Sequence, residues 1–364
     1  MVKRIVHISL CNNYSGLNKI LYIPECVRAG LDVVYLNLAK LVGGEVQGLS
    51  AKDCIEINVS TLSEFDELLL KFQGDTLFNV QIGYEHRWKN IFEIIRKRCS
   101  LTSIFAVGKF PKPDTNIAIN FKRMASLYRR LRTNFFATNH SFYPDYVFAA
   151  GKVAAHPFLG KSKIVKIELR EFEEIGQNFF IDLPEKYIVF IDQYIPFHPD
   201  RILTGIIAVN DASYYQSLFK YFSDLEKATG MEVVVAAHPK SNYPPNFFGG
   251  RKSLTNCTEE LISKSSLVLS HFSTAVCHAV KYGKPLIFIT STSETGLDIK
   301  RHVLPFARYF NAPCHQLGAR VDGCANFEVD ASRYENYKFD FLTWKDSTEI
   351  VFSESFPGYV KKLI

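Results

Sequence analysis

The stretch VVVAAHPK at residues 233–240 indicates how the second half of this chain folds. Its small and β-branched apolar residues are typical of a strand buried in a parallel sheet, and the histidine and proline that follow form a stiff turn. Working outward from it, we expect strands at 186–191, 232–236, 267–270 and 285–290, and helices at 212–229, 259–264 and 274–282. This alternation predicts a βαβ domain built on a parallel sheet.

The first half of the chain shows the same alternation. An apolar run at 3–9 is followed by a polar loop, a helix that Gly30 ends and a second strand at 31–38, which together make a β-loop-α-β unit. Further elements follow in the same order: strands at 76–82, 103–107 and 146–149, and helices at 87–98 and 116–133.

Chain length sets the expected number of domains. A single hydrophobic core usually stops growing at roughly 250–300 residues, and this chain has 364. We therefore predict an α/β protein with two Rossmann-like domains, at 1–180 and 181–335, whose parallel sheets face a central cleft. The aromatic-rich tail at 336–364 is expected to pack back toward the first domain.

Composition excludes several classes of protein. Hydrophobic residues make up 47% and charged residues 22% of the chain, which is typical of a globular protein. No apolar run is long enough to span a membrane, and the apolar start breaks at Cys11, too early for a signal peptide. The eight cysteines form no CxxC pair. We therefore expect a reducing, cytoplasmic location and no structural zinc.

The net charge of +6 is unevenly distributed, with basic residues concentrated at 96–98 and 122–132. Such a cluster favours a phosphate-bearing partner, although each residue alone is equally well explained as part of a solvated helix surface. Peripheral contact with the inner face of the cytoplasmic membrane fits the cluster better than nucleic acid does. The chain has neither a helix-turn-helix pattern nor interleaved aromatic and basic residues.

Polar side chains follow three strands of the second half, at the edge where parallel sheets bind ligands. His238 follows the strand at 232–236 and could donate to a phosphate or a leaving oxygen. Ser273 and Thr274 stand at the start of an expected helix, whose free N–H groups attract anions. Asp192 follows the strand at 186–191 and could be a nucleophile or a general base.

Each of these residues also has a simpler explanation. A lone histidine after a strand is commonly a loop residue without a ligand, a hydroxyl at a helix start commonly caps it, and an aspartate after a strand commonly bonds its own backbone. Their order on successive strands is what favours a nucleotide site. GxGxxG, P-loop, HExxH, GxSxG and DxD motifs are absent, so we expect no catalytic metal and no cofactor.

The order of these motifs resembles that of the bacterial CMP-sugar transferases of surface polysaccharide synthesis. A His-Pro pair after a strand, and a Ser-Thr pair before AVKYGKPLIFI at 279–289, are similar to polysialyltransferases and to capsule or lipopolysaccharide Kdo transferases, which are GT-B-like. Asp-Gln-Tyr at 192–194 most resembles the retaining β-Kdo transferases. The resemblance covers mainly residues 186–290.

This resemblance implies a metal-independent glycosyltransferase that moves Kdo, or a related ulosonic acid, from a CMP-activated donor to a glycan acceptor, free or lipid-linked, in bacterial lipopolysaccharide or capsule synthesis. Asp192 would attack the anomeric carbon and carry the sugar covalently, while His238 would hold the phosphate and assist the departure of CMP. The donor site would be completed by Gln193, His198, Pro239, Lys240, Ser273 and Thr274. The carboxylate of Kdo needs its own partner, and His198, Gln193 and Arg201 all remain open for that role.

Two alternatives remain open at this point. One is an inverting enzyme of the same fold, with Asp192 or a carboxylate of the first domain as general base and a CMP-activated sialic acid or CDP-glycerol as donor. The other is a non-catalytic GT-B-like subunit that binds polysaccharide or phospholipid through its basic residues. Covalent trapping of the sugar separates the first alternative from the retaining enzyme, and CMP binding separates the second.

Overall fold

The computed structural model describes residues 1–10, 15–43, 54–83, 85–108, 111, 142–173, 182–198, 207–208, 210–319 and 328–363. The chain divides into two compact units. The first contains the described residues among Met1–Gly108, Ile117–Glu173 and Phe339–Ile364, and the second those among Lys109–Asn116 and Glu174–Lys338. The basic helix expected at 116–133 lies outside the described residues.

The first unit is built on a seven-stranded parallel sheet with the order β3-β2-β1-β4-β5-β6-β7. β1 is the point from which the chain builds the sheet in both directions, so this is a doubly wound arrangement. The strands are β1 Arg4–Ser9, β2 Asp32–Asn37, β3 Ile55–Asn58, β4 Thr76–Gln81, β5 Thr102–Val107, β6 Tyr146–Ala150 and β7 Lys163–Ile167.

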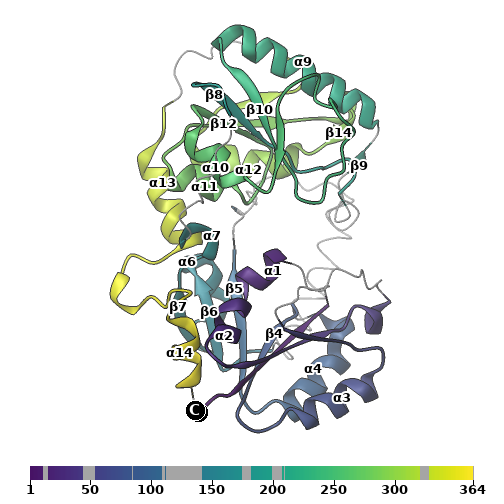
Figure 1. Cartoon of the computed structure of the whole chain (residues 1–364), viewed down its shortest axis with the longest axis vertical. Helices are drawn as coiled ribbons and strands as arrows, with labels where there is room; N and C mark the ends of the chain where they lie inside the picture. Colours follow the sequence, from purple (N-terminus) through teal and green to yellow (C-terminus); the bar gives the residue numbers. More distant parts are fainter. Residues whose placement is uncertain are drawn as a thin grey trace, which may run out of the picture. The chain divides into compact units, whose positions relative to one another are not determined.

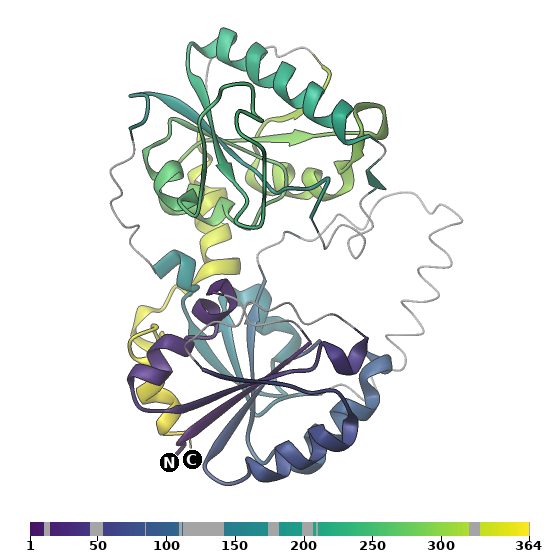
Figure 2. The same cartoon turned by 45° about the vertical axis from the view of Figure 1, so that its right-hand side comes forward.

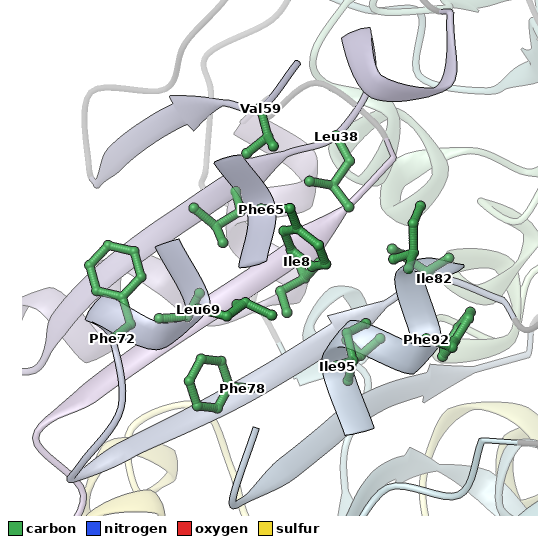
Figure 3. Close-up of a cluster of buried hydrophobic side chains, with 14 of the residues drawn as sticks. Ile8, Leu38, Val59, Phe65, Leu69, Phe72, Phe78, Ile82, Phe92 and Ile95 are labelled. Carbon is green, nitrogen blue, oxygen red and sulfur yellow. The ribbon is translucent and has the colours of Figure 1, made fainter. Parts of the chain in front are cut away.

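Two amphipathic helices, α3 and α4, cover one face of this sheet. α3 spans Leu62–Lys71 and α4 spans Lys89–Arg98. Their apolar sides meet alternate residues of the central strands in a buried cluster, drawn in Figure 3. The cluster includes Ile8, Phe65, Leu69, Phe78, Phe92 and Ile95. Burying each of these large side chains contributes about 1.5–3 kcal/mol to folding.

The other face of the first sheet is covered by an aromatic group to which the end of the chain contributes. Phe356, in helix α14 (Phe356–Lys361), packs against Tyr22, Phe105 and Phe148 with ring centroids 4.9–5.3 Å apart. Helix α2 (Ile23–Arg28) begins directly after Tyr22. The two ends of the chain therefore lie side by side in this unit (Figure 2).

Shorter helices complete the first unit. They are α1 Ser15–Ile20, η1 Lys40–Val42, η2 His86–Trp88, α6 Gly151–Ala155, η3 His156–Phe158, α7 Arg170–Glu173 and η6 Ser347–Glu349. Gly151 has a φ of +75°, and a Cβ there would lie 2.5 Å from the carbonyl oxygen of Asp340. This position therefore requires glycine, because the returning chain passes directly against it.

The second unit is built on a six-stranded parallel sheet with the order β11-β10-β8-β12-β13-β15. All five residues of β8 are buried, as a continuous apolar run predicts for a central parallel strand. The chain builds outward from β8 through β10 and β11, then crosses to β12 on its other side. The strands are β8 Tyr187–Ile191, β10 Glu232–Ala237, β11 Ser253–Thr255, β12 Leu267–Ser270, β13 Leu286–Thr290 and β15 Cys314–Gln316.

Helix α9 (Asp211–Thr229) runs along one face of this sheet, with α10, α11 and α12 on the other face (Figure 1). The side chain of Asn210 caps the first turn of α9, and Gly230, at φ 70°, ends it as expected. The remaining elements are β9 Ile207–Ala208 with β14 Leu297–Asp298, α10 Thr258–Lys264, α11 Val276–Lys281, η4 Ser293–Thr295, α12 Lys300–Phe310 and α13 Ala331–Tyr337. The π-helix η5 (Lys338–Leu342) follows and belongs, from Phe339 on, to the first unit.

One expected helix boundary was wrong at a place that matters for the site. The helix expected from residue 274 begins only at Val276, and its N-cap is Ala275, with no side-chain hydrogen bond. Ser273 and Thr274 therefore lie in the turn before the helix. Among the described residues, no helix is both long and apolar enough to cross a membrane.

Candidate functional site

The carboxyl ends of β8, β10 and β12 bring together side chains singled out in the sequence. Asp192 follows β8, His238 follows β10, and Ser273 lies three residues after β12. β10 and β12 pair with β8 on its two sides, so β8 and β12 form the switch point of this sheet. Ligands of open α/β sheets bind at such a point.

The carboxylate of Asp192 joins the ends of two strands. Its Oδ2 accepts hydrogen bonds from the backbone N–H of His238 at 3.2 Å and from the hydroxyl of Tyr243 at 3.0 Å. Its Oδ1 accepts one from the backbone N–H of Tyr194 at 2.9 Å. Asp192 is only 6% exposed, and burial raises the pKa of its carboxyl above the usual value, while these hydrogen bonds oppose the rise.

The loop after β8 is bent to supply one of these donors. Tyr194 has a φ of 51°, in the left-handed region that non-glycine residues rarely adopt. The bend brings its N–H onto the side chain of Asp192, two residues before it, which is the backbone contact expected of an aspartate after a strand. Such backbone strain is found preferentially where a site is held in a set geometry.

His238 is half-buried at the start of its turn. Its Nδ1 accepts a hydrogen bond from the backbone N–H of Lys240 at 3.1 Å, so the proton of the neutral ring is on Nε2. Its ring lies edge-on to that of His198, with centroids 5.0 Å apart. Pro239 and Lys240 are exposed. The structure therefore brings His198, His238 and the Asp192 carboxylate to one place.

Gln193 connects this group to the loop after β12. Its Oε1 accepts a hydrogen bond from the backbone N–H of Phe272 at 3.0 Å, directly beside Ser273 and Thr274. The hydroxyl of Ser273 accepts from the N–H of Ala275 at 3.2 Å and thus tightens the turn rather than capping the helix. Arg201, a further candidate, lies outside the described residues.

A cluster of aromatic residues around Asp192 was not anticipated from the sequence. Besides bonding Asp192, the hydroxyl of Tyr243 lies 3.0 Å from that of Tyr215 on α9, and its ring stacks on Phe247 at 4.6 Å. The segment that contains Tyr243 and Phe247 also lines a cavity of about 380 Å³. The sequence does place Tyr243 and Phe247 a few residues after the His-Pro turn. It does not show which strand end these side chains contact, because they lie in an irregular loop.

His271, directly after β12, is a structural histidine. It is fully buried, its Nδ1 lies 2.5 Å from the carbonyl oxygen of Ile289 and its Nε2 lies 2.8 Å from the hydroxyl of Tyr214. Burial lowers the pKa of His271 to about 4, so the ring is neutral, donating to Ile289 and accepting from Tyr214. These two contacts join the residue after β12 to strand β13 and to helix α9.

Comparison with known proteins gives the fold. No family model matches the chain, and no curated protein matches it. Among solved structures, the glycotransferase of kitacinnamycin is 10% identical with a TM-score of 0.52, covering 93% of this chain and 94% of its own. The glycosyltransferase SnogD from Streptomyces nogalater is 10% identical with a TM-score of 0.50 and 99% coverage of both chains.

A co-structure of S. aureus MnaA with UDP is also similar, with 12% identity, a TM-score of 0.50 and coverage of 99% of this chain and 96% of its own. Similarities at this level of identity define the architecture. The chain has the GT-B-like fold that the sequence predicted, with two parallel-sheet, Rossmann-like α/β units.

Proposed function

We propose that this chain is a glycosyltransferase that takes its sugar from a nucleotide donor bound at the carboxyl ends of β8, β10 and β12. The observation that carries the proposal is the hydrogen bond by which the Asp192 carboxylate, after β8, holds the turn of His238, after β10. It joins a carboxylate to the backbone of the residue that carries an imidazole, at the switch point of a GT-B-like sheet. Gln193 links them to the turn of Ser273 and Thr274.

Within this class, we propose CMP-Kdo as the donor and a retaining mechanism. An oxygen of Asp192 would form a bond to the anomeric carbon while the bond from that carbon to the phosphate oxygen breaks, and CMP would leave with the electron pair. The Nε2–H of His238 would donate to the departing phosphate. An acceptor hydroxyl would then attack the same carbon and pass its proton to the phosphate of the CMP still bound beside it, while the bond from that carbon to Asp192 breaks and restores the carboxylate.

Covalent trapping tests this mechanism. The protein is incubated with CMP-Kdo without acceptor and its intact mass is measured. We expect an adduct of one Kdo on the wild type and on the control Asp298→Asn, an exposed aspartate of the same unit, and none on Asp192→Asn. Release of CMP and transfer to an acceptor without any adduct on the wild type would exclude the covalent step.

A second candidate is an inverting transferase with Asp192 as general base. The specific observation in its favour is that the carboxylate is almost fully buried and already accepts three hydrogen bonds, which suits positioning or proton transfer as well as attack. Turnover of a CMP-activated sialic acid or of CDP-glycerol without an adduct would select it.

Nucleotide affinity tests the donor class separately. Calorimetry with CMP should show binding that His238→Ala and Ser273→Ala weaken, because both residues would contact the phosphate in the proposed donor complex. UDP is the matched comparison, since it is the nucleotide in the MnaA co-structure. Tighter binding of UDP than of CMP would replace the proposed donor with a UDP-sugar, and binding of neither would favour a non-catalytic subunit.

A further inference from the structure

A Kdo donor brings a second negative charge to the site. Its anomeric carbon carries a carboxylate as well as the phosphate, so a cationic or hydrogen-bonding partner is needed beside the phosphate turn. Of the three candidates seen in the sequence, Gln193 uses its oxygen on the N–H of Phe272, and the ring of His198 lies against His238. Arg201 lies outside the described residues.

The fold brings a basic segment, residues 300–302, to the loop that follows β12. Lys300, Arg301 and His302 form the first turn of α12, which follows β14. The ring of His302 stacks on that of Phe272, the residue before Ser273, with centroids 5.1 Å apart and an interplanar angle of 30°. The N–H of Ile299 also bonds the carbonyl oxygen of Ser291, just after β13, at 3.2 Å. These two contacts hold the first turn of α12 close to the carboxyl ends of β12 and β13.

Arg301 is oriented by this arrangement. It is exposed, and its Nε donates a hydrogen bond to Nε2 of the half-buried His302 at 3.1 Å. Burial and the neighbouring Arg301 charge lower the pKa of His302, which keeps its ring neutral and able to accept. The ring of His302 therefore contacts Phe272 on its face and Arg301 at its edge, and so links the guanidinium to the residue before Ser273.

We propose that Arg301, positioned by His302, binds the carboxylate of the donor sugar and so selects ulosonic acids over neutral hexoses. This inference rests on the proposed function. The planar guanidinium matches a carboxylate with two parallel hydrogen bonds, which lysine cannot make. No hexose carries a carboxylate on its anomeric carbon, so the contact is made only with a donor of the ulosonic class.

The test compares two ligands that differ only in the sugar. Affinities for CMP and for CMP-Kdo are measured by calorimetry in an Asp192→Asn background, which does not form the adduct. The parent of this series, called wild type in this comparison, is set beside Arg301→Gln, Arg301→Lys and His302→Phe. The control is Arg308→Gln, an exposed arginine in the last turn of the same helix. We expect Arg301→Gln to weaken CMP-Kdo by about tenfold or more and CMP by less than about twofold.

The two other variants address positioning. Arg301→Lys keeps the charge but not the paired hydrogen bonds, so it should recover only part of the CMP-Kdo affinity. His302→Phe keeps an aromatic face for Phe272 but removes the acceptor for Arg301, and should weaken CMP-Kdo by an intermediate amount. Arg308→Gln should bind both ligands as wild type does.

The possible results separate this inference from the proposed function. Equal CMP-Kdo affinity in wild type and Arg301→Gln would overturn the carboxylate assignment and leave the transferase standing. If Arg301→Gln weakens the binding of CMP and of CMP-Kdo equally, Arg301 contacts the phosphate, and the carboxylate assignment is overturned in this case too. If the wild type binds CMP but gains nothing from the Kdo group, or binds neither, the CMP-Kdo donor fails and the assignment fails with it.

Discussion

The two units have the same architecture and both bury polar side chains, and two groups of these residues lie at different places along the strands. In the second unit, Asp192 and His271 follow the ends of β8 and β12, and each is hydrogen-bonded to a different segment. In the first unit, His7, Asn79 and Ser103 lie inside β1, β4 and β5 and form one row through the strand register. Buried polar side chains at strand ends can contact a ligand, whereas those in the middle of strands point only toward the helices that cover the sheet.

The same contrast appears in a dipeptide that both units contain. His238-Pro239 directly follows β10, and the His238 backbone is bonded to a buried carboxylate. His156-Pro157 is also His-Pro but begins the short helix η3 and is exposed. The pair therefore indicates a ligand site by its place at a sheet edge, and carries little information by itself.

The largest expected effect on the transfer rate comes from removing the imidazole of the His-Pro pair that follows β10. His238→Ala should lower the transfer rate by about 10²–10⁴-fold, because it removes the group that donates to the departing phosphate. His156→Ala is the matched control and should leave transfer unchanged. Initial rates of CMP release measure both variants. Equal losses in the two would show that the position after β10 has no special role.

A smaller effect is expected from Tyr243→Phe, which removes a hydrogen bond to Asp192 but little volume. A reaction that needs the ionised Asp192 is lost as the pH falls through its raised pKa. Losing the Tyr243 hydroxyl destabilises the ionised form further, so the acidic limb of the rate profile should move to higher pH.

Tyr215→Phe is the control for this shift, since the Tyr215 hydroxyl contacts that of Tyr243 and makes no hydrogen bond to Asp192 in the described structure. Its acidic limb should stay near that of the wild type. The rate should be followed from about pH 4 to pH 8, on either side of the ordinary carboxyl range. Identical profiles for all three proteins would show that Tyr243 only packs.

The smallest effect concerns stability and compares the two buried histidines. His271→Leu leaves the Tyr214 hydroxyl and the Ile289 carbonyl without partners and should cost about 2–4 kcal/mol. Neither ring nitrogen of His7 has a hydrogen-bond partner among the described residues, so His7→Leu should be neutral or slightly stabilising. Hydrogen exchange of the β1 and β12 amides measures each unit separately.

The pH dependence of stability follows from the same two groups. Burial lowers the pKa of His271 to about 4 and that of His7 to about 3, both below the unfolded value near 6.5. Unfolding then takes up protons, so the stability that these neutral rings provide is full above pH 6.5 and falls as the pH drops toward 4. An acid-induced loss that persists unchanged in His271→Leu and His7→Leu would assign it to other groups.

Much of the fold was predictable because apolar runs and glycine ends are local signals. The strand at β8, the helix α9 with Gly230 at its end, and the alternation in both halves were all recovered. The predicted start of α11 was two residues too early. Ser273 and Thr274 are residue types that commonly cap a helix, but here they lie in a turn that precedes it. The roles of Asp192, His238 and the other site residues stay predictions, as does the division between the domains.

The order of residues along the chain was enough to determine the α/β class, the parallel sheets and the three strands that Asp192, His238 and Ser273 follow, because these depend on hydrophobic periodicity within about ten residues. Only the tertiary structure showed that Tyr243 bonds Asp192 and that His302 stacks on Phe272. Those pairs are 51 and 30 residues apart. Contacts at such separations depend on how strands pair and helices pack, which no local pattern encodes.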